Sequence, residues 1–429
     1  MKKKFCLNVF LFIIIFITFI YKYNYNKSVS FNVESDYKKD GLLSLNLETE
    51  VGSGKYEVTT SNVWPTEGYV FNSELSGCEN GSNLLWDDSN KTIIMSGNVS
   101  DKCYVYFDIY VERRYDENCD STFIACNVAK KFTGVQGENS IYYHDSSLVN
   151  GAGDNSYRFT GASDSVNNYV CFGSDETTCS VDNLYRIIGV FGGRVKLIKA
   201  DYATSILLGT DGDYINKYSS GPYGTTNYLG SLIISDIGGY SWNRTGDNEY
   251  GSNAWSTSLL NKTNLNTNYL NNIGNKWSNM IDTTTWKVGG NTGDKISKVI
   301  PSVAYQNEII NPVTTNSTDN ATEYSAKVVL MYVSDYGFAA EPNAWTTTLN
   351  YYYGSSIKGS NWMFMGLNEW TISRHTDSSF TVFYVDGNGG VSWYRASFVI
   401  AVRPVFFLNS FIKYVSGSGT QSDPIRVSN

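Results

Sequence analysis

The chain has 429 residues, which is longer than one ordinary domain, so we expect two or three folded units. Its formal net charge is −8 and only 17% of its residues are charged, which argues against nucleic acid as a partner because phosphate binding needs clustered Lys and Arg. Aromatic residues make up 15% of the chain, and together with the low charge this composition argues against a disordered protein.

Residues 1–21 are predicted to form a signal or anchor helix, and residues 22–40 a polar stalk. Three lysines at positions 2–4 precede an apolar run from Phe5 to Ile20. Lysine beside the hydrocarbon layer favours the cytoplasmic side, so the rest of the chain is expected to be exported. Because the run is shorter than the ~20 residues of a spanning helix, a cleaved signal peptide is the alternative. The sequence predicts a cell-membrane protein with an extracellular C-terminal region, or a secreted protein if the leader is removed.

The cysteines agree with export. Outside the apolar run there are six, and an even number in an exported chain indicates disulfides, with 15 possible pairings. Proximity in the sequence favours three pairs, each closing a short loop: Cys78 with Cys103, Cys119 with Cys126, and Cys171 with Cys179. A metal site is disfavoured because no pair has the two-residue spacing of a zinc knuckle, and the two histidines, His144 and His375, are far apart.

Residues 41–112 are predicted to form a small all-β sandwich. Short alternating segments such as KTIIMSGNV and CYVYFDIYVE are separated by clusters of Gly, Asn, Asp and Ser. Cys78 and Cys103 would connect its two halves, and Trp64 and Trp86 would pack in its core. Residues 113–182, which hold the other four exported cysteines, are expected to be an irregular, disulfide-containing connector.

Residues 183–429 are predicted to form one large domain with an aromatic core, since eight of the ten tryptophans lie between Trp242 and Trp393. The segment LYRIIGVFGGRVKLIKADY is typical of two strands joined by a Gly-Gly turn. Residues 253–281 have helical spacing with a break near Gly274, and residues 326–340 read as a buried strand. Close to the end, Asp386–Gly390 is expected to be the turn of a hairpin between FTVFYV and VSWYR, followed by a Val-Arg-Pro strand that contains Arg403.

The order of these elements resembles an uncharacterised domain family of exported bacterial proteins. In that family a Tyr-Arg-Ile strand pair, a Trp/Ser/Leu-rich helix, a buried strand, a tryptophan block and a terminal Val-Arg-Pro strand follow one another, as they do here. The family is distantly similar to the C-type-lectin-like fold of formylglycine-generating enzymes and of variable receptor-binding proteins of phages and bacteria. With the preceding segments, the resemblance implies an α+β fold class: an N-terminal membrane helix, a small all-β sandwich domain and a C-terminal C-type-lectin-like domain rich in β-hairpins.

The segment NNYVCFGSDETTC before LYRIIGVF is also similar to surface proteins of Gram-positive gut bacteria, some of which carry prepilin-type leaders. The first 20 residues of this chain contain neither Gly nor Glu, so a prepilin peptidase site is missing. Assembly as a structural surface subunit or pseudopilin-like subunit is therefore the alternative function and not the first one.

An enzyme is the least supported reading. Formylglycine-generating enzymes rely on cysteines late in the domain, whereas no cysteine follows Cys179 here. His375 lies in SRHTDSS, where Ser, His and Asp are neighbours in sequence, which is not how catalytic triads are assembled. We therefore predict no catalytic residue.

Calcium is the one cofactor that the sequence leaves open. Glu341-Pro342-Asn343 matches the tripeptide by which sugar-binding C-type lectins ligate calcium, but the partner motif Trp-Asn-Asp is absent. Asp211-Gly212-Asp213 and Asp386-Gly387-Asn388 are better explained as turns. No metal ligand and no cofactor are predicted.

The predicted ligand-binding residues lie around the last hairpin: Arg374, His375, Trp393, Tyr394 and Arg395. Trp, Tyr and Arg are enriched at binding hot spots, and in phage and bacterial relatives of the fold the residues before the last strand form the ligand surface. The alternative is that alternate side chains of VSWYR pack in the core. The sequence predicts a non-catalytic, adhesin-like protein that recognises an extracellular glycan or protein.

Overall fold

The computed structural model describes twelve segments of the chain. They are residues 28–31, 43–49, 54–59, 64–65, 69–87, 92–98, 100–109, 119–218, 237–245, 249–291, 299–313 and 321–429. The predicted signal or anchor helix (1–21) and all of the predicted stalk except residues 28–31 lie outside them. The chain divides into two compact units, Met1–Arg113 and Arg114–Asn429, and each is described by itself.

The predicted α+β fold class is wrong, and the expected N-terminal membrane helix is not supported, because residues 1–21 lie outside the described segments. Among the described residues strands predominate, with 36% in strands and 20% in helices. Its helices are short, the longest having ten residues among those described, because β-branched and aromatic stretches alternate with Gly- and Asn-rich turns. No helix in the described segments has both the length and the apolar character to cross a membrane.

The smaller unit consists of strands that form two sheets. One has the order β1 (Ser28–Phe31), β6 (Thr92–Ser96), β5 (Asn83–Asp87), and the other β3 (Tyr56–Val58), β2 (Leu43–Glu48), β7 (Cys103–Ile109), β4 (Tyr69–Cys78). Side chains from both sheets share one apolar core, in which Trp64 is buried and Trp86 packs against it. The Cys78–Cys103 disulfide joins the neighbouring strands β4 and β7 of one sheet.

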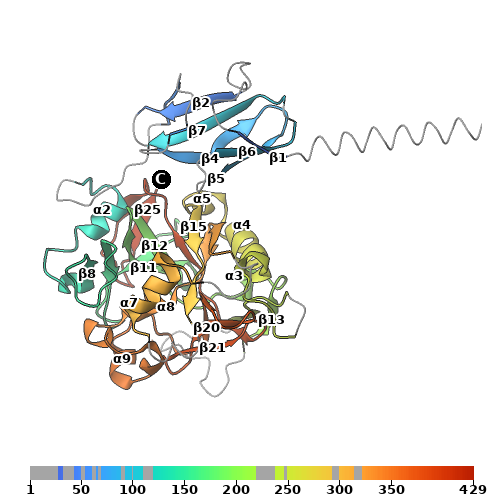
Figure 1. The fold of residues 1–429 in the computed structure, drawn as a ribbon. Helices are drawn as coiled ribbons and strands as arrows, with labels where there is room; N and C mark the ends of the chain where they lie inside the picture. Colours follow the sequence, from blue (N-terminus) through green and yellow to red (C-terminus); the bar gives the residue numbers. More distant parts are fainter. Residues whose placement is uncertain are drawn as a thin grey trace, which may run out of the picture. The chain divides into compact units, whose positions relative to one another are not determined.

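The larger unit is built on a nine-stranded sheet (Figure 1). Its strands are β18 (Val328–Val329), β23 (Val405–Phe407), β12 (Arg194–Lys199), β11 (Leu184–Phe191), β10 (Tyr169–Cys171), β25 (Ile425–Ser428) and β24 (Lys413–Ser416), with β9 (Ser156–Phe159) on β11 and β8 (Ile141–His144) on β9. The segment 119–182, expected as a connector, thus contributes three strands and helix α2 (Ile124–Ala129) to this unit.

Disulfide bonding is confirmed, and the pairs are the three that sequence proximity favours. In the larger unit Cys119 pairs with Cys126 and Cys171 pairs with Cys179. The first joins Cys119 to helix α2, and the second closes a loop beside β10.

The predicted hairpin in residues 184–202 is confirmed. Strands β11 and β12 pair antiparallel, with Phe191 opposite Arg194 across Gly192 and Gly193. Both glycines have positive φ, 49° and 85°, as a tight turn between twisted strands requires.

The predicted helix at 253–281 exists as a broken run. It comprises η3 (Trp255–Thr257), the π-helix η4 (Leu260–Tyr269), α4 (Leu270–Ile273) and α5 (Asn275–Ser278). Gly274, with φ 81°, ends α4 and starts α5, where the sequence places the break.

The prediction of a buried strand at residues 326–340 is wrong for most of the segment. After the two residues of β18 the chain turns into helix α8 (Val333–Ala339). Asp335 caps the start of this helix: its Oδ2 accepts the Tyr332 N–H at 3.0 Å. All seven helical residues are buried, so no polar face marks the segment as a helix.

Three smaller sheets complete the described part of the larger unit. Their strands are β13 (Tyr214–Lys217), β14 (Gly238–Ser241) and β22 (Val399–Ile400); β15 (Thr284–Lys287) and β17 (Glu323–Ala326); and β16 (Gly290–Asn291), β19 (Glu369–His375), β20 (Thr381–Val385) and β21 (Val391–Arg395). The remaining helices are η1 (Glu138–Ser140), η2 (Val181–Asn183), α3 (Ser205–Leu208), α7 (Pro301–Tyr305), η5 (Gln306–Ile310), η6 (Pro342–Ala344), η7 (Leu349–Tyr351) and α9 (Ser355–Gly359). Strands β20 and β21 lie at the end of this unit opposite to β25 (Figure 1).

Candidate ligand-binding surface

The hairpin of β20 and β21 carries three of the predicted ligand-binding residues. Asp386 forms its turn: Oδ1 accepts the N–H groups of Asn388 (2.7 Å) and Gly390 (3.2 Å), and Gly389 has φ 98°. The carboxylate therefore fixes the turn and with it the register of the two strands. In that register Trp393 lies opposite Phe383.

Strand β21 is an edge strand of its sheet, whose order is β16-β19-β20-β21 within the described segments. The Ala396 N–H donates to Phe380 O at 2.8 Å. Because hydrogen-bonded pairs alternate along an antiparallel ladder, the main chain of Tyr394 faces β20 and that of Trp393 faces away from it. No hydrogen bond from another residue of the described segments reaches the main chain of Trp393. An edge of this kind can accept a further extended strand.

Aromatic side chains gather along this edge. Trp393, Tyr394 and Phe398 are 45%, 43% and 41% exposed. The rings of Tyr394 and Phe398 meet edge to face, with centroids 4.5 Å apart. We call these three side chains, together with Arg395 and its ring partners Tyr250 and Phe380, the aromatic edge.

Each exposed group of the aromatic edge rests on a neighbour. Trp393 packs edge to face on His375, with centroids 5.2 Å apart. The Arg395 guanidinium lies 3.8 Å from the centroid of the Tyr250 ring, which in turn packs on Phe380 at 5.2 Å. These contacts restrict the rotamers of large side chains that are still open to solvent.

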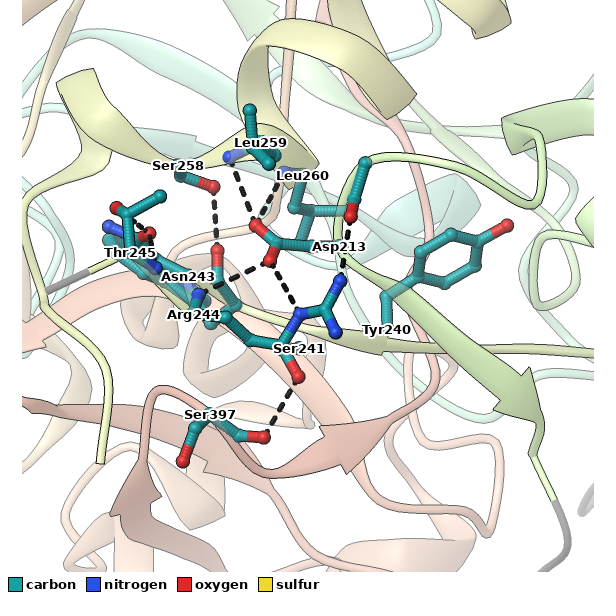
Figure 2. A network of polar contacts seen from close by, with 12 residues as sticks. Asp213, Tyr240, Ser241, Asn243, Arg244, Thr245, Ser258, Leu259, Leu260 and Ser397 are labelled. Carbon is teal, nitrogen blue, oxygen red and sulfur yellow. Dashed lines mark hydrogen bonds and ion pairs between the residues drawn. The ribbon is translucent and has the colours of Figure 1, made fainter. Parts of the chain in front are cut away.

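A polar network holds the loop that carries Phe398 (Figure 2). Ser397 O accepts the hydroxyl of Ser241 at 2.8 Å, and the Ser397 N–H donates to Tyr250 O at 3.1 Å. The loop is thereby tied to β14 on one side and to the segment of Tyr250 on the other. The aromatic edge is therefore attached to the folded unit beyond the end of β21 as well as through β20.

Asp213 is the centre of the same network (Figure 2). Its Oδ2 accepts the N–H groups of Leu259 and Leu260, both at 2.9 Å, at the start of the broken helix. Its Oδ1 accepts from the main chain and the guanidinium of Arg244, both at 3.2 Å. The carboxylate is fully buried and serves as a helix cap and an ion-pair partner.

The other two predicted ligand-binding residues are not at the surface. Arg374 is 1% exposed, and its guanidinium donates to Val288 O (2.6 Å) and Ala321 O (3.1 Å). Burial lowers its pKa to about 10. His375 is 7% exposed, stacks on Phe383 and accepts the Asp377 N–H at 3.1 Å. Arg374 thus stabilises the interior through its hydrogen bonds, and the ring of His375 packs against Trp393.

The residues considered for calcium are engaged in local structure. Glu341 precedes the short 3-10 helix η6, and Asp386 is occupied by its own turn. Across the segments that the structure describes, no group of three or more His, Cys, Asp or Glu side chains is placed to hold a metal ion.

Sequence reasoning did not find Tyr250, Phe380 and Phe398. Phe398 is four positions after Tyr394, so the strand pattern could have indicated it. Tyr250 follows a polar segment far from the hairpin, and no local pattern predicts its contact with Arg395.

Comparison with protein-family models, curated proteins and solved structures gives no match for this chain. The resemblance to exported bacterial surface proteins therefore stays a prediction.

Proposed function

We propose that the protein is an exported, non-catalytic recognition protein that binds an extracellular glycan or protein ligand through the aromatic edge. The observation that carries the proposal is the half-exposure of Trp393, Tyr394 and Phe398 beside Arg395. Trp393 and Tyr394 lie on an edge strand with their side chains on its opposite faces, and Phe398 follows the strand and packs on Tyr394. Trp, Tyr and Arg are the side chains that contribute most to binding energy at interfaces.

The support of these side chains favours binding. Side chains that are already ordered lose less conformational entropy when a ligand binds. Trp393 is packed on His375, and Arg395 on Tyr250. The rings present apolar faces to a sugar ring or an apolar side chain, and the guanidinium offers several donors to a carboxylate or carbonyl group.

The compartment is part of the proposal. Three disulfides in one chain are typical of oxidising environments outside the cytoplasm. With the lysines and apolar run at the start of the sequence, they support a protein at the cell surface or secreted from the cell.

The test is a glycan-array and protein-binding screen with the full-length protein and two variants. The first variant replaces Trp393, Tyr394 and Phe398 by Ala. The matched control is Phe411→Ala, which removes a similarly exposed ring (42%) away from the hairpin. We expect the triple variant to lose binding at least tenfold and the control to keep it. The proposal would be contradicted if the wild-type protein bound nothing in the screen. It would also be contradicted if the triple variant bound the ligand as tightly as the wild type.

One observation favours a second candidate, a structural subunit whose partners are copies of itself. The outward main chain of Trp393 could pair with the same strand of another molecule. Electron microscopy of expressing cells distinguishes the two, because filaments or a lattice that disappear on Trp393→Pro would favour the subunit.

A further inference from the structure

Lys196 and Asp335 form a buried ion pair in the larger unit. Lys196 Nζ lies 2.5 Å from Asp335 Oδ2, and the two side chains are 3% and 1% exposed. Lys196 belongs to β12, within the nine-stranded sheet, and Asp335 to the first turn of α8. The pair therefore joins two elements whose contacting residues are 139 positions apart in the sequence.

Aromatic rings surround the amino group of Lys196. Its Nζ lies 4.6 Å from the ring centroid of Tyr332 and 5.5, 5.6 and 5.8 Å from those of Phe191, Trp286 and Phe407. Burial lowers the pKa of Lys196, because an apolar surrounding penalises the charged form. The neutral amine, which this favours, is the nucleophilic form of lysine.

The carboxyl group of Asp335 has one further donor and one nearby cation. The Tyr332 N–H donates to Oδ2 at 3.0 Å, and Arg158 Nη1 lies 3.9 Å from Oδ1. If an amine attacks Cγ, negative charge develops on the carboxyl oxygens, and the Arg158 charge lies beside one of them. Fixed positive charge at such a position lowers the barrier of an acyl transfer.

Glu308 is hydrogen-bonded to the residue that precedes Asp335. It is fully buried in η5, and its carboxyl group accepts the Ser373 hydroxyl and, at 3.1 Å, the N–H of Ser334, the neighbour of Asp335. Burial, and to a smaller extent the charge of Asp335, raises its pKa to about 7. A charged Glu308 raises the pKa of Lys196, but by less than burial lowers it. At neutral pH this carboxyl group can both accept and release a proton.

We propose that Lys196 and Asp335 become joined by an intramolecular isopeptide bond between Nζ and Cγ, formed by the folded chain itself with Glu308 carrying protons. The ion pair first passes one proton from the ammonium group to the carboxylate, which gives an amine and a carboxylic acid. The amine nitrogen attacks Cγ and a C–N bond forms. Glu308 takes a proton from this nitrogen and delivers it to the leaving hydroxyl, the C–O bond breaks, and one water molecule leaves. Ammonium and carboxylate thus become a neutral amide and water, and Glu308 ends in its starting state.

The burial of the pair favours this outcome. Two charges withdrawn from water retain a desolvation cost that their attraction repays only in part, whereas an amide carries no net charge. The folded chain also holds the two groups in contact, which replaces a bimolecular encounter by an intramolecular one. The bond would tie β12 to α8 and keep the two elements together when the rest of the unit unfolds.

The test is the intact mass of the full-length protein after reduction and denaturation, followed by peptide mapping. We expect a mass below that of the sequence, allowing for any removed leader, by one water molecule. We also expect one branched peptide that joins the segments of Lys196 and Asp335. Lys196→Arg keeps the charge and Glu308→Gln keeps the size of the side chain; both variants should show the full mass. Lys199→Arg, on the same strand and also buried, is the matched control and should keep the deficit.

Two results would overturn the proposal. One is a wild-type protein that is folded, as judged by a cooperative unfolding transition, and has the full mass. The other is a deficit that persists in Lys196→Arg or maps to an Asp-Gly dipeptide such as Asp386-Gly387, where succinimide formation also releases water. The wild-type measurement decides the matter even if a variant fails to fold.

Discussion

Arg403 Nε lies 2.7 Å from Glu369 Oε1, and both side chains are buried. Arg403 also donates to Met363 O at 2.7 Å. Glu369 is the first residue of β19, and Arg403 precedes β23 of the nine-stranded sheet. The pair therefore connects the sheet that carries the aromatic edge to the main sheet of the unit.

Removal of one partner of this pair should strongly destabilise the protein. Glu369→Ala leaves a buried guanidinium without its carboxylate, so we expect the free energy of unfolding to fall by about 3–5 kcal/mol. Lys276→Ala is the control, because Lys276 and Asp175 form an ion pair with 54% and 68% of the side chains exposed, which contributes about 1 kcal/mol or less. Urea unfolding followed by tryptophan fluorescence measures both, and equal effects would contradict the assigned role.

The two arginines predicted as ligand-binding should behave differently. Arg374→Ala removes two hydrogen bonds to main-chain carbonyls from the interior, so stability should fall by more than about 2 kcal/mol. Arg395→Ala removes an exposed contact with Tyr250, so stability should change by less than about 1 kcal/mol while ligand binding weakens. Thermal unfolding measures the loss of stability, and the binding screen measures the loss of binding. A stable Arg374→Ala variant that does not bind would show that Arg374 contacts the ligand and has no structural role.

Glu308 should make the protein less stable as the pH rises. Its pKa is about 7 in the folded state against 4.5 ordinarily, so the native protein binds this proton more tightly than the unfolded chain. The contribution is complete below about pH 4.5 and is lost as the pH rises through 7; it is on the order of 3 kcal/mol. His144, whose pKa burial lowers, acts in the opposite sense, so the measurement compares wild type with Glu308→Gln.

Unfolding free energies of the two proteins across this range provide the test. The difference between wild type and Glu308→Gln should shrink with rising pH. A difference that stays constant would mean that Glu308 titrates as an exposed carboxylate does.

The hairpins were predictable because short segments encode them. Gly192 and Gly193 supply the positive φ angles of one turn, and the side chain of Asp386 forms the other. Helix α8 was not predictable from the sequence. All seven of its residues are buried, and a fully buried helix has the same apolar pattern as a buried strand. Asp335, an acidic residue in the first turn, was a local sign of a helix start.

The candidate site was predictable in part for a similar reason. The composition of VSWYR indicates an aromatic strand, but its exposure depends on β21 lying at a sheet edge. The polar segment SRHTDSS suggests a surface loop, yet Arg374 is buried because main-chain carbonyls satisfy its guanidinium. The contacts of Tyr250 with Arg395 and of Lys196 with Asp335 join distant segments, which local patterns do not reveal.

Asp213 provides a test between a calcium ligand and a structural carboxylate. Both of its oxygens accept hydrogen bonds from the protein, so Asp213→Ala should leave the main-chain N–H groups of Arg244, Leu259 and Leu260 without this acceptor and lower stability by about 2 kcal/mol or more. Asp213→Asn, which keeps one acceptor oxygen, should cost less. Calcium added to the wild-type protein should leave its Tm unchanged, because no oxygen of Asp213 is free to bind it. A calcium-dependent rise in Tm that disappears in both variants would identify a cation site and contradict the structural role.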